Sequence, residues 1–325
     1  MPAHAWSWHE GLGVIITVTL SPSLDRTIEI PALGRGTVIR ATSSSVEAGG
    51  KGVNVSRALL ANGVPSVAVI PLGGAVGDEL AALLKAQDVE MTVVPVKAAT
   101  RSNVTLSEPD GTTTKINEVG SPLTREEIDH VEETVCQLAR ADDWVVLSGT
   151  LPAGAANDTY ARFVRRLTHA GVKVAVDTSG PALAESLAAG PTLIKPNRDE
   201  LAEAIDGPIN SFTEAAAAAE SLRARGARAV LASLGGEGAI LADGGLCAAA
   251  CSVADRRSTV GAGDCLLAGF LAAGASGQQA LLSAVQWAAA SVALPGSGVP
   301  TSAQIALRHP DLITDFDRRP LSILT

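Results

Sequence analysis

The chain is poor in aromatic residues and methionine: aromatics make up 3% of its 325 residues, and methionine occurs twice. Hydrophobic residues still reach 46%, so the chain can bury a large core, which must be built mainly from Ala, Val, Leu and Ile. Positive charge is also scarce, since the formal net charge is −9. This balance argues against an electrostatic nucleic-acid binder, and we expect no nucleic-acid partner.

Long uncharged apolar runs are absent from the sequence, so we expect no membrane-spanning helix and no membrane partner. Residues 1–13 contain no hydrophobic signal core and are expected to be a short N-terminal extension. The four cysteines form no Cys-x-x-Cys pair, which argues against a zinc site and favours reduced thiols. We therefore expect a cytoplasmic protein.

Two common phosphate-binding motifs are incomplete. In the glycine loop 258–264, Leu266 occupies the place of the third glycine of a dinucleotide fingerprint. The Gly50-Lys51 pair is followed by Gly52 instead of Ser or Thr, and Ser45 stands at the leading glycine of a P-loop. Neither motif assigns a nucleotide site.

Apolar strands and amphipathic helices alternate along most of the chain, which predicts an α/β fold with a mostly parallel sheet covered by helices on both faces. The expected strands are 14–20, 66–70, 144–147, 173–177, 192–195, 229–234 and 239–242, the last two being taken as the final strands. The expected helices are 53–62, 79–87, 124–140, 159–170, 215–225, 263–273 and 278–294.

Two segments break this alternation. Residues 27–46 and 91–118 read as strands bounded by turns, without helices of their own. We expect them to form a small accessory sheet. Such a sheet can cover ligands at the carboxyl ends of the parallel strands, where ligands bind in open α/β folds.

The glycine loop Ser258–Asp264 precedes an apolar helical run and is the most informative motif of the chain. Glycines allow close backbone approach, and a helix start directs N–H groups and a positive dipole end at a phosphate. A carboxylate repels a phosphate, so Asp264 is better explained as a base acting on the group that attacks the phosphorus. The alternative is an ordinary glycine-rich turn with a solvated aspartate.

Two further segments near the N-terminus have binding and structural interpretations. Asp25 follows the first expected strand, where it can accept sugar hydroxyls or form an Asx turn. The bend Ala48–Asn54 contains three glycines and a lysine at a helix start, which suits a ligand, although a flexible turn has the same composition.

The remaining candidates are weaker when taken singly. Arg101 suits bidentate phosphate binding, but its local sequence favours a solvated arginine. Asn197 and Glu200 can hold Mg²⁺ through water or cap a helix. The turn 233–238 can cradle phosphates or close a hairpin. The five histidines are scattered and are expected at the surface: His4, His9, His130, His169 and His309.

Taken together and in order, these motifs resemble the ribokinase-like family of carbohydrate kinases, in particular its phosphosugar branch. The resemblance runs from about residue 15 to about 301 and implies a single ribokinase-like domain over 14–310, with the accessory sheet as a lid. Its motifs are Gly49–Asn54, Thr100–Asn103, Ser148–Pro152, Lys195–Asn197, Ser233–Gly235 and Ser258–Asp264.

The resemblance also implies roles for individual residues. Asp264 would be the catalytic base, and Gly261, Ala262 and Gly263 would form the anion hole. The acceptor sugar and its phosphate would be bound by Asp25, Gly49, Gly50, Lys51, Gly52, Asn54, Arg101, Asn103 and Ser148. ATP would be bound by Lys195, Asn197, Ser233, Gly235, Gly236, Gly238 and Thr259. Asn197 and Glu200 would hold Mg²⁺ through water.

The implied reaction is ATP-dependent phosphorylation of fructose 1-phosphate at O6 to give fructose 1,6-bisphosphate. The lysine at position 51 makes the glycine bend similar to that of kinases that act on fructose 1-phosphate and tagatose 6-phosphate. The sequence Ser258–Val260 is similar to the corresponding segment of the phosphofructokinases. Fructose 6-phosphate and tagatose 6-phosphate remain alternative acceptors. A non-catalytic regulator that binds sugar phosphate or nucleotide is an alternative of another class.

The resemblance further implies a homodimer formed through the lid, and it leaves a requirement for K⁺ open because Ser258 stands where many relatives have an acid. Two other departures are mild. Cys265 follows the expected base where many relatives have serine, and Thr150 replaces a more usual serine.

Overall fold

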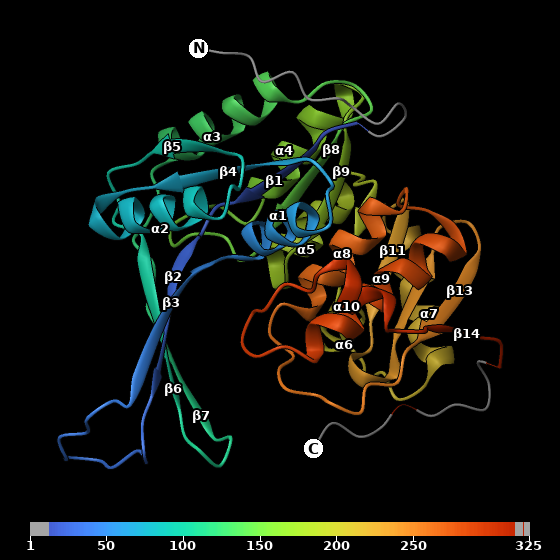
Figure 1. Cartoon of the computed structure of the whole chain (residues 1–325). Coiled ribbons are helices and arrows are strands. Elements are labelled where there is room, and N and C mark those ends of the chain that lie inside the picture. The colour runs from blue at the N-terminus through green and yellow to red at the C-terminus, as the bar shows by residue number, and fades with distance from the viewer. Residues whose placement is uncertain (1–12, 316–320, 322–325) are drawn as a thin grey trace.

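The computed structural model describes residues 13–315 and residue 321 (Figure 1). Its body is a large sheet between two layers of helices, and a second, smaller sheet extends away from this body at one end. The expected α/β architecture is confirmed. The expected N-terminal extension lies outside the described residues except for Gly13.

The large sheet has ten strands in the order β14-β13-β12-β11-β10-β9-β8-β1-β4-β5. Neighbouring strands from β11 to β5 are parallel, and the β11–β14 edge is antiparallel. The strands are β1 (Ile15–Thr19), β4 (Ser66–Leu72), β5 (Met91–Pro95), β8 (Trp144–Ser148), β9 (Lys173–Asp177), β10 (Leu193–Ile194), β11 (Ala229–Ser233), β12 (Ala239–Ala242), β13 (Leu246–Ala250) and β14 (Asp311–Ile313).

The prediction that β12 is the last strand is wrong. β13 is the run Leu-Cys-Ala-Ala-Ala, which contains no β-branched or aromatic residue, so its local sequence carries little strand propensity. It becomes a strand because it pairs antiparallel with β12 through a tight turn. Ala248 and Ala249 are fully buried there, so small side chains suit its position against α9.

Helices cover both faces of the large sheet. Those on one face share a core with Ile16 and Val18 of β1, and those on the other face pack against Ile15 and the alternate strand residues. The first layer holds α3 (Arg125–Leu138), α4 (Thr159–His169), α5 (Gly180–Ala188), α6 (Arg198–Ile205) and α7 (Phe212–Ala224). The second holds α1 (Lys51–Ala61), α2 (Gly74–Ala86), α8 (Ala262–Ala272), α9 (Gly277–Val292) and α10 (Ser302–Ala306). No helix in the described part of the chain is both long and apolar enough to cross a membrane.

The smaller sheet, which we call the lid, has four strands in the order β3-β2-β6-β7. Its strands are β2 (Ser23–Glu29), β3 (Ser43–Gly49), β6 (Arg101–Ser107) and β7 (Thr113–Asn117). They form the twisted extension seen at the lower left of Figure 1.

The expected lid boundary at residue 91 is wrong. Met91–Pro95 is β5, which pairs parallel with β4 at the edge of the large sheet. Val94 is buried in the core under α3, and β4, α2 and β5 form a β-α-β unit with parallel strands. The run Met-Thr-Val-Val has the same alternating pattern as a lid strand, so its sequence alone does not assign it to one sheet.

The parallel register aligns polar residues at the carboxyl ends of the central strands. Thr19 of β1 pairs with Ser148 of β8, and Ser148 pairs with Asp177 of β9. Lys195 continues the row, since its N–H donates to the carbonyl of Val176. All four residues are buried. These polar groups line the carboxyl ends of the strands, on the side of the sheet where the lid begins.

The packing of α8 against α9 gives a test of the core. A Cβ at Gly269 would lie 2.7 Å from Trp287 Cγ and 2.9 Å from the carbonyl oxygen of Ser283. We predict that Gly269→Ala lowers the free energy of unfolding by about 1–3 kcal/mol, because this clash outweighs the gain in helix propensity. Urea denaturation measures the change.

Gly245→Ala is the control for this substitution. Gly245 lies between β12 and β13, and no atom lies within 4 Å of its would-be Cβ. The control should change stability by less than about 0.5 kcal/mol. Equal stability of the two variants would contradict close packing at Gly269.

Candidate active site

Asp264 lies in the first turn of α8. Gly261 precedes the helix in a left-handed conformation with φ of 77°, which favours glycine. Its carbonyl accepts the N–H groups of Asp264 at 3.0 Å and Cys265 at 2.9 Å. The Asp264 side chain therefore sits beside the positive end of a buried helix, where an anion is stabilised.

The Asp264 carboxyl is buried and accepts a 2.8 Å hydrogen bond from Asn54 Nδ2 of α1. Burial and the nearby charge of Asp177 raise the pKa of Asp264 to about 7, although Asn54, Lys195 and Lys51 oppose this shift. A carboxyl with a pKa near neutral pH is matched to taking up a proton at that pH, as a general base does.

The bend before α1 needs its glycines. A Cβ at Gly49 would overlap the Asp25 carboxylate, and a Cβ at Gly52 would lie 2.6 Å from Thr19 Oγ1. Gly50 has φ of 129°, a conformation open to glycine and strained for other residues. The bend thus packs directly against β1 and Asp25, and it places Asn54 one turn into α1.

Asp25 belongs to the lid strand β2. Its Oδ1 accepts hydrogen bonds from Ser23 Oγ at 2.7 Å and from Asn103 Nδ2 at 2.9 Å. Asn103 lies directly across on β6, in register with Asp25. Two predicted sugar-binding residues far apart in the sequence are therefore joined on one face of the lid.

Asp177 is a site residue that the sequence reasoning missed. Its fully buried carboxylate accepts a 2.9 Å hydrogen bond from Lys51 Nζ, and its second oxygen lies 3.2 Å from Lys195 Nζ. A Cβ at Gly263 would lie 3.3 Å from Lys195 Nζ, so this group adjoins the start of α8. The available signal was an aspartate ending the run Val-Ala-Val-Asp in β9.

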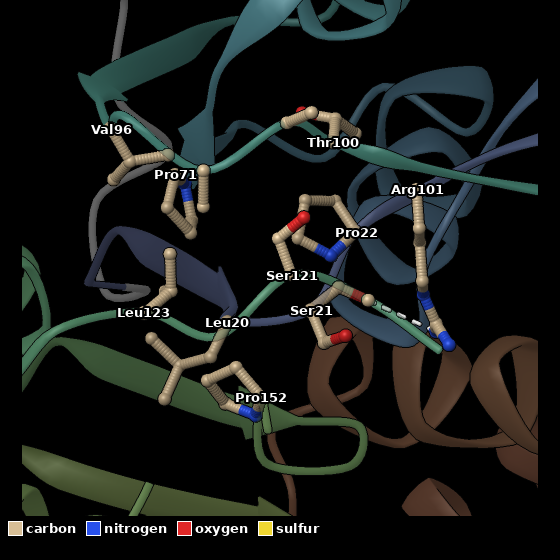
Figure 2. A pocket seen from close by; sticks show the side chains of 13 residues that line it. Leu20, Ser21, Pro22, Pro71, Val96, Thr100, Arg101, Ser121, Leu123 and Pro152 are labelled. Carbon is tan, nitrogen blue, oxygen red and sulfur yellow. Dashed lines mark hydrogen bonds between the residues drawn. The ribbon is translucent and has the colours of Figure 1, made fainter. Parts of the chain in front are cut away.

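Arg101 lies at the base of the lid. Its guanidinium donates to the carbonyls of Ser21 at 3.3 Å and Glu118 at 3.5 Å. It lines a cavity between three of the four segments that connect the lid to the body, and Figure 2 shows its side chain at one side of this cavity with its hydrogen bond to Ser21. Most of the lining residues come from these three segments: Leu20–Pro22, Ala98–Arg101, and Gly120, Ser121 and Leu123.

Asn197 and Glu200 form a capping box at the start of α6. Asn197 Oδ1 accepts the Glu200 N–H at 2.8 Å, and Glu200 Oε2 accepts the Asn197 N–H at 2.9 Å. Glu200 Oε1 is left out of this box and lies 3.7 Å from Lys51 Nζ. The capping interpretation is thus realised, and one carboxylate oxygen remains for a water-mediated ligand.

The other predicted nucleotide-binding residues occupy neighbouring loops. Ser233 ends β11 and bridges to Asn197, and its N–H donates to the carbonyl of Pro196 at 3.0 Å. Gly235, Gly236 and Gly238 form the hairpin turn between β11 and β12. Thr259 is exposed before α8. No group of three or more Asp, Glu, His or Cys side chains in residues 13–315 is arranged to hold a metal ion.

Buried polar atoms without a partner gather at this site. Among the described residues such atoms are rare, and most belong to predicted site residues or to Asp177. Five belong to these residues, namely Asn54 Oδ1, Asn103 Oδ1, Ser148 Oγ, Asp177 Oδ2 and Arg101 Nε, and the other three belong to Arg57, Arg162 and Arg308. Native proteins satisfy nearly all buried polar groups, so a cluster of unsatisfied ones marks a place where a polar ligand binds.

The predictions of surface histidines and free thiols are confirmed for the described residues. His130, His169 and His309 are exposed, and His4 and His9 lie outside the described residues. The four cysteines are free thiols. Burial raises the pKa of Cys265 to about 12, so this thiol beside Asp264 stays protonated and unreactive.

Comparison with known proteins gives consistent similarities. Residues 19–304 match the model of the pfkB family carbohydrate kinases. A 1-phosphofructokinase of Xanthomonas campestris is 38% identical over 79% of this chain and 83% of its own length. The ATP-dependent 6-phosphofructokinase isozyme 2 of Escherichia coli is 33% identical over 78% and 83% of the two chains.

Solved structures extend the similarity to three dimensions. Phosphofructokinase-2 from Escherichia coli in complex with substrates and products superposes with a TM-score of 0.85, at 30% identity over 90% of this chain and 97% of its own. Other structures of that enzyme contain potassium or show a tetrameric inhibited form.

The raised pKa of Asp264 predicts a cost in stability. In the unfolded chain an aspartate ionises near pH 3.8, so between pH 4 and 7 the folded state binds more protons and stability falls as pH rises. Asp264→Asn should therefore stabilise the fold by a few kcal/mol at pH 8, and the gain should shrink as pH falls from 7 toward 4.

Thermal unfolding at several pH values measures this gain. Asp143→Asn is the matched control, because the buried Asp143 carboxylate accepts the N–H groups of Val14 and Arg140 and its loss should destabilise the fold. A gain for Asp264→Asn that is independent of pH would contradict the raised pKa.

Proposed function

The chain belongs to the pfkB family of carbohydrate kinases, and we propose that it transfers the γ-phosphoryl group of ATP to O6 of fructose 1-phosphate, giving fructose 1,6-bisphosphate. One observation carries the proposal: a buried carboxyl with a pKa about 7, Asp264, sits at the start of α8 beside Gly263 and Lys195. A base and an anion-binding helix start thus lie side by side, as phosphoryl transfer to a hydroxyl requires.

Asp264 takes the proton of the attacking hydroxyl as the oxygen approaches the γ-phosphorus. Asn54 fixes the orientation of the carboxylate through its 2.8 Å hydrogen bond. The backbone of Gly261–Gly263 and the dipole of α8 stabilise the negative charge on the transferring phosphoryl group. Lys195 adds positive charge at the same corner.

The acceptor is held between the lid and the strand ends. Asp25 and Asn103 of the lid, with Asn54 and Ser148 of the body, offer hydrogen-bonding atoms to sugar hydroxyls. Arg101 at the lid base supplies a guanidinium for the phosphate that the acceptor already carries. Lid closure excludes water, which limits wasteful hydrolysis of ATP.

The residues at α6 fit a magnesium ion bound through water. Glu200 Oε1 lies outside the capping box, 3.7 Å from Lys51 Nζ, and Mg²⁺ commonly retains several waters through which such an oxygen can hold it. When bound with ATP, the ion supplies charge neutralisation for the phosphates. A requirement for K⁺ remains an open part of the proposal, suggested by the potassium complex of the Escherichia coli enzyme.

We also propose a homodimer that forms through the lid. Four large apolar side chains on the lid and its flanking connections are exposed: Leu33, Val38, Ile116 and Val119. Such residues are typical of a surface that another copy covers. The cytoplasmic location remains a prediction.

The mechanism predicts that Asp264→Asn lowers turnover by orders of magnitude. Asparagine keeps the size and the contact to Asn54 but accepts no proton, so kcat should fall by about 10²–10⁴-fold while ATP still binds. A coupled ADP-release assay measures kcat, and calorimetric titration measures ATP binding. Cys265→Ser, which alters the neighbouring buried residue with little change in size, should retain near-normal kcat.

Near-normal turnover of Asp264→Asn would contradict the role of this base. Loss of ATP binding in the same variant would instead indicate a disturbed fold. A wild-type chain that binds ATP and sugar phosphate but consumes no ATP would favour the regulator alternative.

A panel of phosphosugars identifies the acceptor. We expect kcat/KM to be higher for fructose 1-phosphate than for fructose 6-phosphate or tagatose 6-phosphate, as the similarity to 1-phosphofructokinases suggests. The fructofuranose ring is nearly two-fold symmetric, so one pocket can present either terminal hydroxyl to Asp264. A higher kcat/KM for fructose 6-phosphate would keep the mechanism and change the acceptor.

A further inference from the structure

Asp177 is a fully buried carboxylate without an assigned role in the reaction. Its Oδ1 accepts from Lys51 Nζ at 2.9 Å, and its Oδ2 lies 3.2 Å from Lys195 Nζ. The second contact is an ion pair without hydrogen-bond geometry, which leaves Oδ2 unsatisfied. One buried negative charge therefore holds two ammonium groups, of which the Lys195 side chain is 4% exposed and the Lys51 side chain 35% exposed.

The two lysines reach Asp177 from different elements. Lys51 is the first residue of α1, and Lys195 follows β10. Lys195 Nζ adjoins Gly263, and both lysines act on the Asp264 charge. Asp177 thus brings two cations to the start of α8, beside the group that receives the proton.

The environment of Lys51 differs from that of a residue that binds the acceptor. Its ammonium faces Asp177 and, at 3.7 Å, Glu200, both in the body. Both partners carry the opposite charge and hold the ammonium on the body side of the site. Reaching a phosphate elsewhere would break the 2.9 Å pair and leave the fully buried Asp177 carboxylate with one cation, which is costly.

We propose that Asp177 is a positioning residue that fixes Lys51 and Lys195 as a two-lysine clamp on the phosphoryl group in transfer, and that Lys51 does not bind the phosphate already on the acceptor. The inference rests on the proposed kinase function. In the step, the acceptor oxygen forms a bond to the γ-phosphorus as the bond to the β,γ-bridging oxygen breaks. Asp264 receives the proton, ADP leaves, and the clamp neutralises the phosphoryl oxygens throughout.

Steady-state kinetics of Asp177→Asn and Lys51→Met in the full-length chain test the clamp. Each should lower kcat by about 10²-fold, the usual effect of removing one preorganised group at a transition state, with KM for the phosphosugar changed less than about threefold. The opposite pattern overturns the proposal: a tenfold or larger rise in phosphosugar KM with kcat retained places Lys51 on the phosphate of the acceptor.

The pH profile separates positioning from a merely structural role. Asp264 is faced by Lys51 and Asn54 of α1, Asp177 of β9 and Lys195 after β10, and its ionisation sets the acidic limb of kcat/KM near pH 7. Removing the negative charge in Asp177→Asn should move this limb to lower pH. Removing the positive charge in Lys51→Met should move it to higher pH. Misfolding alone lowers the amount of active protein and leaves the limb in place, which would overturn the clamp.

Asp143→Asn is the matched control. Asp143 is a buried aspartate that precedes β8, at the end of the sheet opposite Asp177, and it accepts backbone N–H groups there. This variant should lower the melting temperature while kcat, phosphosugar KM and the acidic limb stay unchanged. Wild-type protein that consumes no ATP with any phosphosugar would overturn the proposed function and the clamp with it. If the wild-type protein is active and the Asp177→Asn variant has the same kcat, the clamp is overturned and the proposed function stands.

Discussion

Two buried carboxylates within one site are the constraint on which the rest of the structure depends. Asp264 and Asp177 repel each other, and this repulsion contributes to the raised pKa of Asp264. The arrangement is stable because Lys51 and Lys195 neutralise Asp177 and because Asn54 donates to Asp264. Lys51 and Asn54 belong to α1 and Lys195 follows β10, so these contacts hold α1, β9, the segment after β10 and α8 together.

The apolar layers make this fixed geometry possible. Residues 264–271 of α8 are all buried, and Gly269 lets α9 approach closely through Trp287. A helix held so tightly cannot shift its first turn toward or away from a ligand, which keeps Asp264 and the glycines preorganised. The shortage of aromatic residues is consistent with this packing, since alanine and glycine allow helices to approach closely.

The fold could be predicted from the sequence where periodicity was strong and local. Thr124 caps α3 as its capping-box pattern indicated, and β9 and β12 have the predicted bounds. The errors arose where tertiary pairing decides the structure: Met91–Pro95 joins the large sheet, and the alanine-rich β13 is a strand through its neighbours.

The candidate site shows the same contrast between residues that local motifs reveal and residues that only tertiary contacts bring together. Glycine-rich motifs pointed to Asp264 and to the bend at Gly49–Gly52, because a requirement for glycine can be recognised in the sequence alone. Asp177 was missed, since a single aspartate after three apolar residues has no motif, and its meaning comes from the register that aligns it with Ser148 and Lys195. The engagement of Lys51 by Asp177 joins residues 126 positions apart, which no local pattern encodes.

The two sheets divide the chemistry between them. Groups suited to the acceptor, Asp25, Asn103 and Arg101, lie on the lid strands, whereas Asp264, Lys195 and Asp177 belong to the body. Asn54 and the glycine bend connect the two sets, because Gly49 packs on Asp25 and Asn54 donates to Asp264. Under the proposed function, a change of acceptor involves the lid, the bend and Ser148, while Asp264, Lys195 and Asp177 can remain the same. Such a separation is consistent with the similarity of this chain to both a 1-phosphofructokinase and a 6-phosphofructokinase.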